Sequence, residues 1–219
     1  MATWVLHLRV AEIVKNSLDL KVDETAYYVG AIAPDSGRMV DNFTYLPSKD
    51  VSHWKREGVS YEQRFEDNGD FFRAYGENET DNFKKSFCLG YYVHILTDTI
   101  YVRDIIAPFI SEHGKPFWRE NIEKIRAGWY EIDHRFVANN KDFRPLELIY
   151  GVKEFKNDFL DYFTEDDITE RILFAAELYK NGKPNENAEF VTHDEKRAEA
   201  LVDLMSKTIV KILKDKHGF

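Results

Sequence analysis

Cysteine is almost missing from this sequence: Cys88 is the only one in 219 residues. A single cysteine excludes a disulfide within the chain, and it excludes zinc or iron–sulfur sites that need several thiolates. Long apolar runs are missing too. The longest mainly apolar stretch, Phe87 to Leu96, is too short to cross a bilayer and carries His94. We therefore expect no transmembrane segment and no cysteine-based metal site.

Positive charge is in deficit as well. The sequence holds 30 lysines and arginines against 39 aspartates and glutamates, a net charge of −9 with neutral histidines. This balance predicts no overall basic surface for long nucleic acids. An acidic protein can still act on phosphate esters, provided that bound cations supply the local positive charge. The first fifteen residues lack the basic start and the cleavage site of a secretory signal, so we expect a cytoplasmic protein.

Several catalytic motifs are absent. The sequence has neither the glycine patterns of Rossmann and P-loop proteins nor the G-x-S-x-G turn of serine hydrolases. A di-iron carboxylate bundle needs two Glu-x-x-His pairs, and Glu131 with His134 supplies only one. The single His-Asp dipeptide, His193-Asp194, is not followed by the later aspartate that an HD-type phosphohydrolase requires in its proper context.

Helical periodicity is what the sequence does have. Hydrophobic residues make up 43% of the chain and aromatic residues 15%, which is enough for one core. They recur at helical spacing, whereas alternating strand patterns are few. The sequence therefore predicts an all-α, multi-helix bundle in one domain, residues 1–219, in which residues 140–219 add packing helices. The predicted helices cover residues 4–20, 24–33, 80–110, 116–139, 145–163, 166–180 and 193–215.

Local sequence signals indicate where some of these elements begin and end. Pro34 disfavours helical conformation in the residue before it, so the second helix should end by Ala33. Residues 34–60 contain three turn signals and are expected to form a long ordered loop, of a length that is usually functional in a compact domain. Thr192 and Glu195 have the spacing of a capping box at the start of the last helix.

The sharpest chemical signal is the stretch Gly90-Tyr-Tyr-Val-His94-Ile-Leu-Thr-Asp98. Four residues turn an α-helix by about 400°, which leaves His94 and Asp98 roughly 40° apart on one face. An imidazole and a carboxylate placed in this way can share one cation. A His–Asp hydrogen bond along the helix explains the pair as well, so both interpretations stay open at this point.

Three more residues could join this pair. His7 lies in the apolar segment that opens the first predicted helix, Asp35 follows Pro34 after the second, and His53 lies in the long loop. Each has an ordinary explanation by itself, as a core histidine, a turn aspartate and an exposed polar residue. Together with the helical pair, Asp35 and His53 would give a zinc ion four suitable ligands. His7 could then approach a second ion that Asp98 bridges.

This set of residues resembles the zinc-dependent phospholipase C superfamily, which includes the single-strand-specific nucleases, and the resemblance covers about residues 3–105. It implies an all-α bundle with metal ligands in the same chain order. The matching positions are His7, Asp35 in Ala-Pro-Asp, His53 before a tryptophan, and the helix Gly-Tyr-Tyr-Val-His94-x-x-x-Asp98. By this resemblance one zinc ion is held by four of them, and His7 with the bridging Asp98 holds part of a second site.

The second half of the sequence departs from the family pattern. Members with three metal ions use a later histidine and a His-x-x-x-Glu helix, and no such motif follows Asp98. Secreted members bind metal through an N-terminal tryptophan, whereas Trp4 is internal. We therefore expect one or two divalent ions, zinc or another such metal, with Asp133 as a further ligand or base.

The function that the resemblance implies is hydrolysis of phosphate esters by a phospholipase C-like phosphodiesterase that uses a metal-activated water. Asp35, Asp98 and Asp133 would be its catalytic carboxylates, and a small phosphoester would be its substrate. Two alternatives remain open. One is a helical binding or structural module that a metal stabilises without catalysis. The other is a metal-free helical interaction domain.

Overall fold

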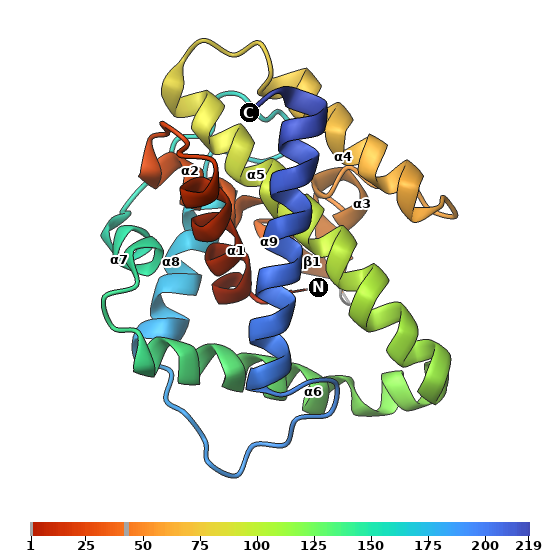
Figure 1. Cartoon of the computed structure of the whole chain (residues 1–219). Helices are drawn as coiled ribbons and strands as arrows, with labels where there is room; N and C mark the ends of the chain where they lie inside the picture. The colour runs from red at the N-terminus through yellow and green to blue at the C-terminus, as the bar shows by residue number, and fades with distance from the viewer. Residues whose placement is uncertain (1, 42–43) are drawn as a thin grey trace.

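The predicted all-α fold class is confirmed, and the described part of the chain adds only one short β-hairpin. The computed structural model describes residues 2–41 and 44–219. Helix α5 (Asn82–Tyr101) runs through the middle of the bundle, with α1 (Trp4–Ser17) and α9 (Glu195–His217) beside it (Figure 1). The other elements are α2 (Glu24–Gly30), the 3-10 helix η1 (Ala33–Asp35), β1 (Arg38–Asp41), β2 (Thr44–Leu46), α3 (Lys49–Ser52), α4 (Tyr61–Tyr75), the π-helical turn η2 (Val102–Ile106), α6 (Ala107–Asn139), α7 (Arg144–Gly151) and α8 (Asp167–Asn181).

Helices α2 and α5 approach each other closely because glycines lie at their contact. A Cβ atom added at Gly90 would lie 1.9 Å from the carbonyl oxygen of Tyr27, and one added at Gly30 would lie 2.1 Å from the carbonyl oxygen of Phe87. A larger residue at either position would have to push the two backbones apart. The contact holds the C-terminal end of α2 against the face of α5 that carries His94.

The helix predicted over residues 80–110 does not stop at its proline. α5 passes through the π-helical turn η2 directly into α6, and Pro108 lies at the start of α6, just after this turn. The chain bends at Gly114, whose φ is +85°, before Pro116. From this bend the rest of α6 runs back across the lower end of the bundle (Figure 1).

Residues 34–60, predicted as a long loop, contain several short elements. Strands β1 and β2 form an antiparallel hairpin in which Arg38 pairs with Leu46. Helix α3 follows, and the hydroxyl of Ser48 caps it by accepting a hydrogen bond from the N–H of Val51. Elements of three or four residues are too short to leave a periodic pattern in the sequence.

Two helical predictions differ from the structure. Helix α4 was not predicted, because its residues are mostly polar and include Gly69, although Phe71 and Phe72 are buried. The helix predicted over residues 145–163 ends at Gly151. Beyond it, the side chain of Asn157 closes a loop by accepting from the N–H of Leu160 and donating to its carbonyl oxygen. Such side-chain contacts compete with helical hydrogen bonds.

The capping box predicted at Thr192 is wrong as well. The carboxylate of Asp194 caps α9 by accepting from the N–H of Arg197 at 2.8 Å. The hydroxyl of Thr192 instead accepts a hydrogen bond from the indole N–H of Trp129 at 2.7 Å. Aspartate is at least as good an N-cap as threonine, so a tertiary partner for Thr192 was enough to shift the cap.

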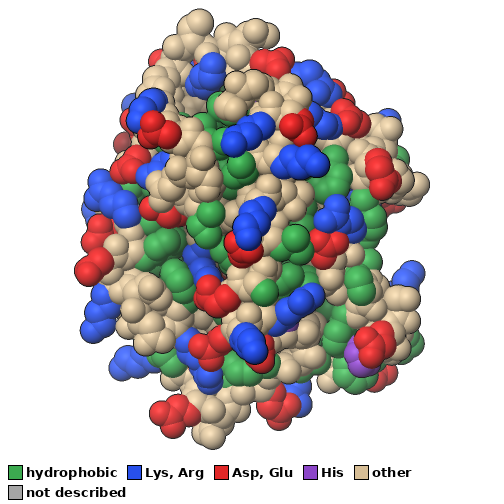
Figure 2. Space-filling model, in the orientation of Figure 1, with side chains coloured by type: hydrophobic (Ala, Val, Ile, Leu, Met, Phe, Trp, Pro, Cys, Tyr) green, Lys and Arg blue, Asp and Glu red, His purple; other side chains and the backbone are tan. Residues whose placement is uncertain are grey.

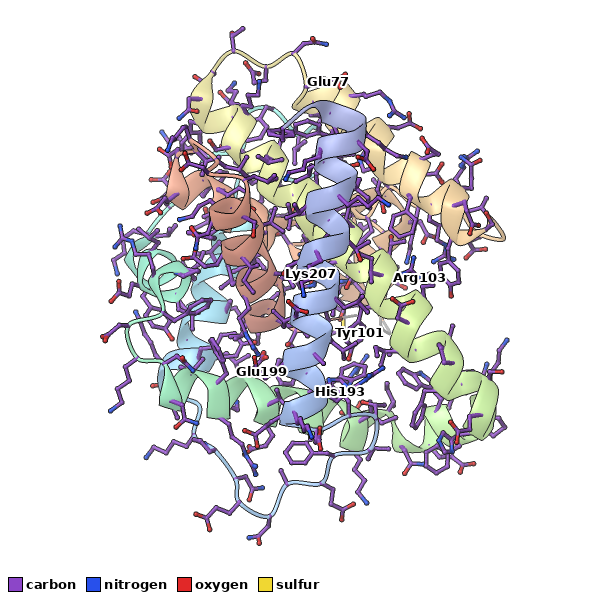
Figure 3. All side chains as sticks on the ribbon, in the orientation of Figure 1. Glu77, Tyr101, Arg103, His193, Glu199 and Lys207 are labelled. Carbon is purple, nitrogen blue, oxygen red and sulfur yellow. The ribbon has the colours of Figure 1, made fainter. Side chains whose placement is uncertain are left out.

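Helix α9 covers the outer side of α1 and α5. Arg9 on α1 pairs with Glu199 on α9 at 2.6 Å, and the rings of Tyr101 and His193 lie 6.0 Å apart at the other edge of the contact (Figure 3). On the face that α9 dominates, acidic and basic side chains are interspersed with apolar ones (Figure 2). Within the described residues, every helix is too short or too polar to span a membrane.

Candidate metal centre

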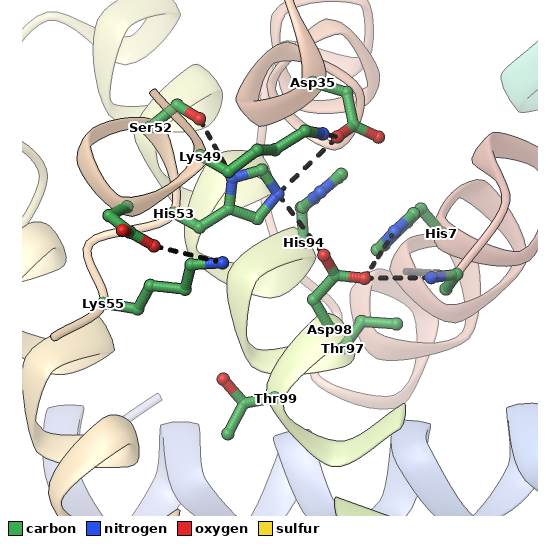
Figure 4. A network of polar contacts seen from close by, with 12 residues as sticks. His7, Asp35, Lys49, Ser52, His53, Lys55, His94, Thr97, Asp98 and Thr99 are labelled. Atoms are coloured by element: carbon green, nitrogen blue, oxygen red, sulfur yellow. Dashed lines mark hydrogen bonds and ion pairs between the residues drawn. The ribbon is translucent and has the colours of Figure 1, made fainter. Parts of the chain in front are cut away.

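One face of α5 carries a buried imidazole and a buried carboxylate one turn apart. His94 is fully buried and Asp98 is 6% exposed. Three other segments meet this pair: His7 comes from α1, Asp35 ends η1, and His53 directly follows α3 (Figure 4). We call these five residues the His–Asp cluster. The structure thus brings together five of the six residues that the sequence singled out.

The donor atoms of the His–Asp cluster form two overlapping groups. His7, His94 and Asp98 make one group, and Asp35, His53 and His94 make the other. Within each group, one donor atom from each residue lies within 4.8 Å of the others. Nitrogen and oxygen donors this close together need only small movements to surround a metal ion with bonds of about 2.0–2.2 Å.

Asp98 lies between two imidazoles. Its Oδ1 is 3.4 Å from Nε2 of His7, and its Oδ2 is 3.3 Å from Nε2 of His53. Burial by itself would raise the pKa of Asp98, but the two imidazoles outweigh burial and hold it well below its usual range. An ionised carboxylate whose oxygens face different imidazoles is suited to bridging two cations.

A backbone hydrogen bond fixes the ring of His94. Its Nδ1–H donates to the carbonyl oxygen of Ala31 at 2.8 Å, since a carbonyl can only accept. Burial lowers the pKa of His94 well below its usual value, so the ring is neutral and Nε2 carries a lone pair. The ring also stacks on His7, with 3.6 Å between centroids and 5° between planes. Orientation and tautomer are therefore both set for binding a cation through Nε2.

The Nε2 atom of each imidazole in the cluster lacks a hydrogen-bond partner. Nε2 of His7, of His53 and of His94 is buried in each case, and none takes part in a hydrogen bond. Each such group costs about 1–3 kcal/mol when it is left unsatisfied. Divalent cations would satisfy these atoms through their lone pairs. The residues present therefore fit a metal centre.

Asp35 is held from two sides. Its Oδ2 accepts a hydrogen bond of 2.9 Å from the indole Nε1–H of Trp4. Its Oδ1 lies 3.6 Å from Nε2 of His53 and contacts the ammonium group of Lys49. Burial would raise the pKa of Asp35, but the charge of Lys49 and the neighbouring imidazoles of His94 and His53 together outweigh burial and bring it below its usual range. Asp35 is therefore ionised, and its Oδ1 already faces the cationic side chain of Lys49.

His53 is positioned by hydrogen bonds that the sequence analysis missed. Oγ of Ser52 lies 2.9 Å from Nδ1 of His53, and the amide of Asn68 donates to the carbonyl oxygen of His53 at 3.5 Å. The hydroxyl of Thr99, the residue after Asp98, donates to Oδ1 of Asn68 at 2.8 Å. Asn68 belongs to α4, and it links the segment of His53 to α5. No spacing in the sequence could have indicated this role, because α4 itself gave no signal.

Asp133, the sixth predicted residue, lies outside both donor groups. Its Oδ1 accepts from the hydroxyl of Thr3 at 2.8 Å, and its Oδ2 accepts from the hydroxyl of Tyr179 at 2.6 Å. Burial raises the pKa of Asp133 to about 7, against the opposing effect of these hydrogen bonds. The neighbour of Thr3, Ala2, donates its N–H to Oδ1 of Asp98 at 3.0 Å. Asp133 thus holds the segment that contacts the cluster and does not itself reach it.

Comparison with known proteins bears on this geometry. The family model described as zinc dependent phospholipase C matches residues 6–173. That range is more than half of the chain and contains the whole His–Asp cluster. No curated protein and no solved structure matches the chain.

Proposed function

The chain belongs to the zinc-dependent phospholipase C family, and from this premise we propose that it is a metal-dependent hydrolase of phosphate esters that cleaves phosphodiester bonds. One observation carries the proposal. Three buried imidazole Nε2 atoms without hydrogen-bond partners lie beside two ionised carboxylates. Neutral imidazoles and carboxylates are the donor types that zinc binds.

The donors divide unequally between two cation positions. Nε2 of His94 can bind only one ion, so it serves one donor group and not both. With Asp35 and His53 it makes a three-donor position, to which Oδ2 of Asp98 adds a fourth donor, 3.3 Å from Nε2 of His53. His7 and Oδ1 of Asp98 remain for a second ion. We therefore propose one tightly held zinc ion and a weaker second position beside His7.

A divalent cation at this centre supplies positive charge to phosphoryl oxygens and lowers the pKa of a bound water. The chain's own residues would bind the cation and hold its ligands in a fixed orientation. Trp4 keeps Oδ1 of Asp35 turned inward by holding Oδ2, and the carbonyl of Ala31 keeps Nε2 of His94 unprotonated. Because the cluster is buried, charges within it interact more strongly than they would at the surface. Because a metal-activated water would be the nucleophile, this activity needs no nucleophilic side chain.

A metal-stabilised module without catalysis is the second candidate, and the burial of the cluster favours it. Asp35, His53 and Asp98 are only 7%, 4% and 6% exposed. Structural zinc sites are closed, whereas catalytic sites keep one coordination position open to substrate or water. In this case the protein would hold zinc and hydrolyse no phosphoester.

Metal content and turnover together test the proposal. Protein purified without chelator should contain about one equivalent of zinc or more, and it should hydrolyse bis-p-nitrophenyl phosphate. A chelator and the substitution His94→Ala should each abolish this turnover. Full zinc occupancy without turnover on a panel of phosphodiesters and phosphomonoesters would favour the module. A zinc content near zero would contradict both candidates.

A further inference from the structure

Lys49 brings an ammonium group to the edge of the His–Asp cluster. It is the first residue of α3 and lies one helical turn before His53, so the two side chains share a face and both reach Asp35. The ammonium contacts Oδ1 of Asp35, the same oxygen that lies 3.6 Å from Nε2 of His53 (Figure 4). A lysine and an imidazole donor thus approach a single carboxylate oxygen.

Lys49 is also the most exposed part of this arrangement. Its side chain is 27% exposed, compared with 6% for that of Asp35 and 5% for that of His53. Among the ion pairs of the described residues, it is the one lysine or arginine that pairs with a carboxylate of the cluster. The Lys49 side chain therefore extends from the buried donors toward solvent.

Asp35 does not depend on Lys49 for its orientation. The indole of Trp4 already holds Oδ2 through a hydrogen bond of 2.9 Å. A divalent cation on Oδ1 would repel the ammonium beside it, since like charges at such distances interact strongly in a buried site. The lysine stem is flexible, and its ammonium can donate in three directions. The group is therefore able to leave Asp35 and meet an anion.

We propose that Lys49 binds the anionic phosphate of the substrate at the edge of the metal centre. Before metal binds, its ammonium group compensates the negative charge of Asp35. The inference rests on the proposed hydrolase function and adds a specificity-determining residue to it. The chain has a net charge of −9, so its overall charge opposes the approach of an anionic phosphate. An ammonium at the entrance offsets this repulsion locally and favours a charged phosphate over a neutral ester.

Zinc affinity of the metal-free protein tests the first half of the proposal. Lys49→Met should bind zinc about three- to tenfold more tightly than the wild type, because a competing charge has left Asp35. Competition with a chromophoric chelator measures this affinity without any substrate. Lys55→Met is the matched control, because Lys55 lies in the same segment but pairs with the exposed Asp50 at 3.3 Å. Its zinc affinity should equal that of the wild type.

Phosphate binding tests the second half. Titration calorimetry of the zinc-loaded protein with inorganic phosphate should show about tenfold weaker binding in Lys49→Met, since a charge-assisted hydrogen bond is lost. Lys49→Arg should stay within about threefold of the wild type, because a guanidinium also binds phosphate. For bis-p-nitrophenyl phosphate, KM should rise about tenfold in Lys49→Met while kcat changes much less. Lys55→Met should leave the phosphate affinity, KM and kcat unchanged.

Phospholipid headgroups and soluble phosphodiesters share this phosphate contact, so the loss in Lys49→Met should be seen with both. The wild-type ratio of kcat/KM for a short-chain phospholipid and for glycerophosphocholine then identifies the source of the substrate. The proposal is overturned if Lys49→Met binds zinc no more tightly than the wild type, or binds phosphate equally well. A wild-type protein without zinc or turnover would instead contradict the proposed hydrolase function, so the two failures are distinguishable.

Discussion

The carbonyl oxygen of Ala31 accepts a hydrogen bond from Nδ1 of His94 at 2.8 Å, and this contact joins helix packing to metal chemistry. The carbonyl lies there because α2 and α5 meet at Gly30 and Gly90. The bond keeps the proton on Nδ1 and leaves the lone pair on Nε2. The spacing of two helices therefore sets the tautomer of a metal ligand.

Gly90→Ala should destabilise the metal-free protein by about 2–3 kcal/mol, because its new Cβ would lie 1.9 Å from the carbonyl oxygen of Tyr27. Urea unfolding measures the change. Gly151→Ala is the matched control, since nothing lies within 4 Å of its Cβ position. The control should change the free energy of unfolding by less than about 0.5 kcal/mol. Equal stability of the two variants would show that α2 and α5 can separate without cost.

Trp4→Phe should weaken zinc binding about tenfold while leaving most of the packing in place. Phenylalanine keeps an aromatic ring beside Phe174 but cannot donate to Oδ2 of Asp35, so that carboxylate loses its fixed orientation. Competition with a chromophoric chelator gives the affinity. Trp118→Phe serves as the control, because Trp118 packs against Trp129 on α6 and touches no residue of the cluster. An unchanged zinc affinity in Trp4→Phe would rule out the indole as a positioning group.

Asn68→Ala should lower the free energy of unfolding by about 2 kcal/mol and weaken zinc binding about tenfold. The variant leaves the hydroxyl of Thr99 and the carbonyl of His53 without their partner, and it frees the segment that carries the imidazole. Asn121→Ala is the control, because its amide donates to the carbonyl oxygen of Phe117 at an exposed position on α6. If Asn68→Ala lost stability but kept full zinc affinity, the link between α4 and the metal centre would be structural only.

Asp133 should make stability depend on pH. Its pKa is raised from 3.8 to about 7 by burial, so the folded state holds a proton that the unfolded state releases. The proton on Asp133 therefore makes its full contribution to the free energy of unfolding below pH 3.8. This contribution is lost as pH rises through 7, by at most about 1.4 kcal/mol for each pH unit. Asp133→Asn cannot titrate, so its stability relative to the wild type should increase between pH 5 and pH 7.5.

Urea unfolding at several pH values measures this trend for Asp133→Asn. Asp203→Asn is the matched control, because Asp203 is an exposed residue that pairs with Lys207 one turn away on α9. The control should follow the wild type throughout the range. A constant difference between Asp133→Asn and the wild type would show that Asp133 stays ionised in the folded protein.

The sequence predicted the part of the site that lies on a single helix. His94 and Asp98 are four residues apart on a strongly apolar helix, so their shared face followed from helix geometry alone. His7, Asp35 and His53 each had an ordinary structural explanation, and only their order along the chain, compared with a known family, suggested that they meet. The structure places all five in one cluster.

The remaining features depend on tertiary contacts. Lys49 and Asn68 act on the cluster from α3 and α4, which are a four-residue helix and a helix with a mostly polar sequence. Asp133 was expected as a ligand or base because it is an acid on a predicted helix. Whether it faced the cluster or the hydroxyl of Tyr179 was decided by how α6 packs against α8, which no local pattern encodes.

X-ray absorption at the zinc edge of the purified protein tests the central claim most directly. We expect a first shell of nitrogen and oxygen atoms at about 2.0–2.2 Å, with the outer scattering of imidazole rings and no sulfur. His53→Ala should reduce the imidazole signal or lose the metal. A sulfur shell at about 2.3 Å would place zinc at Cys88, and a protein without zinc would leave the His–Asp cluster without its cation; either result would contradict the account.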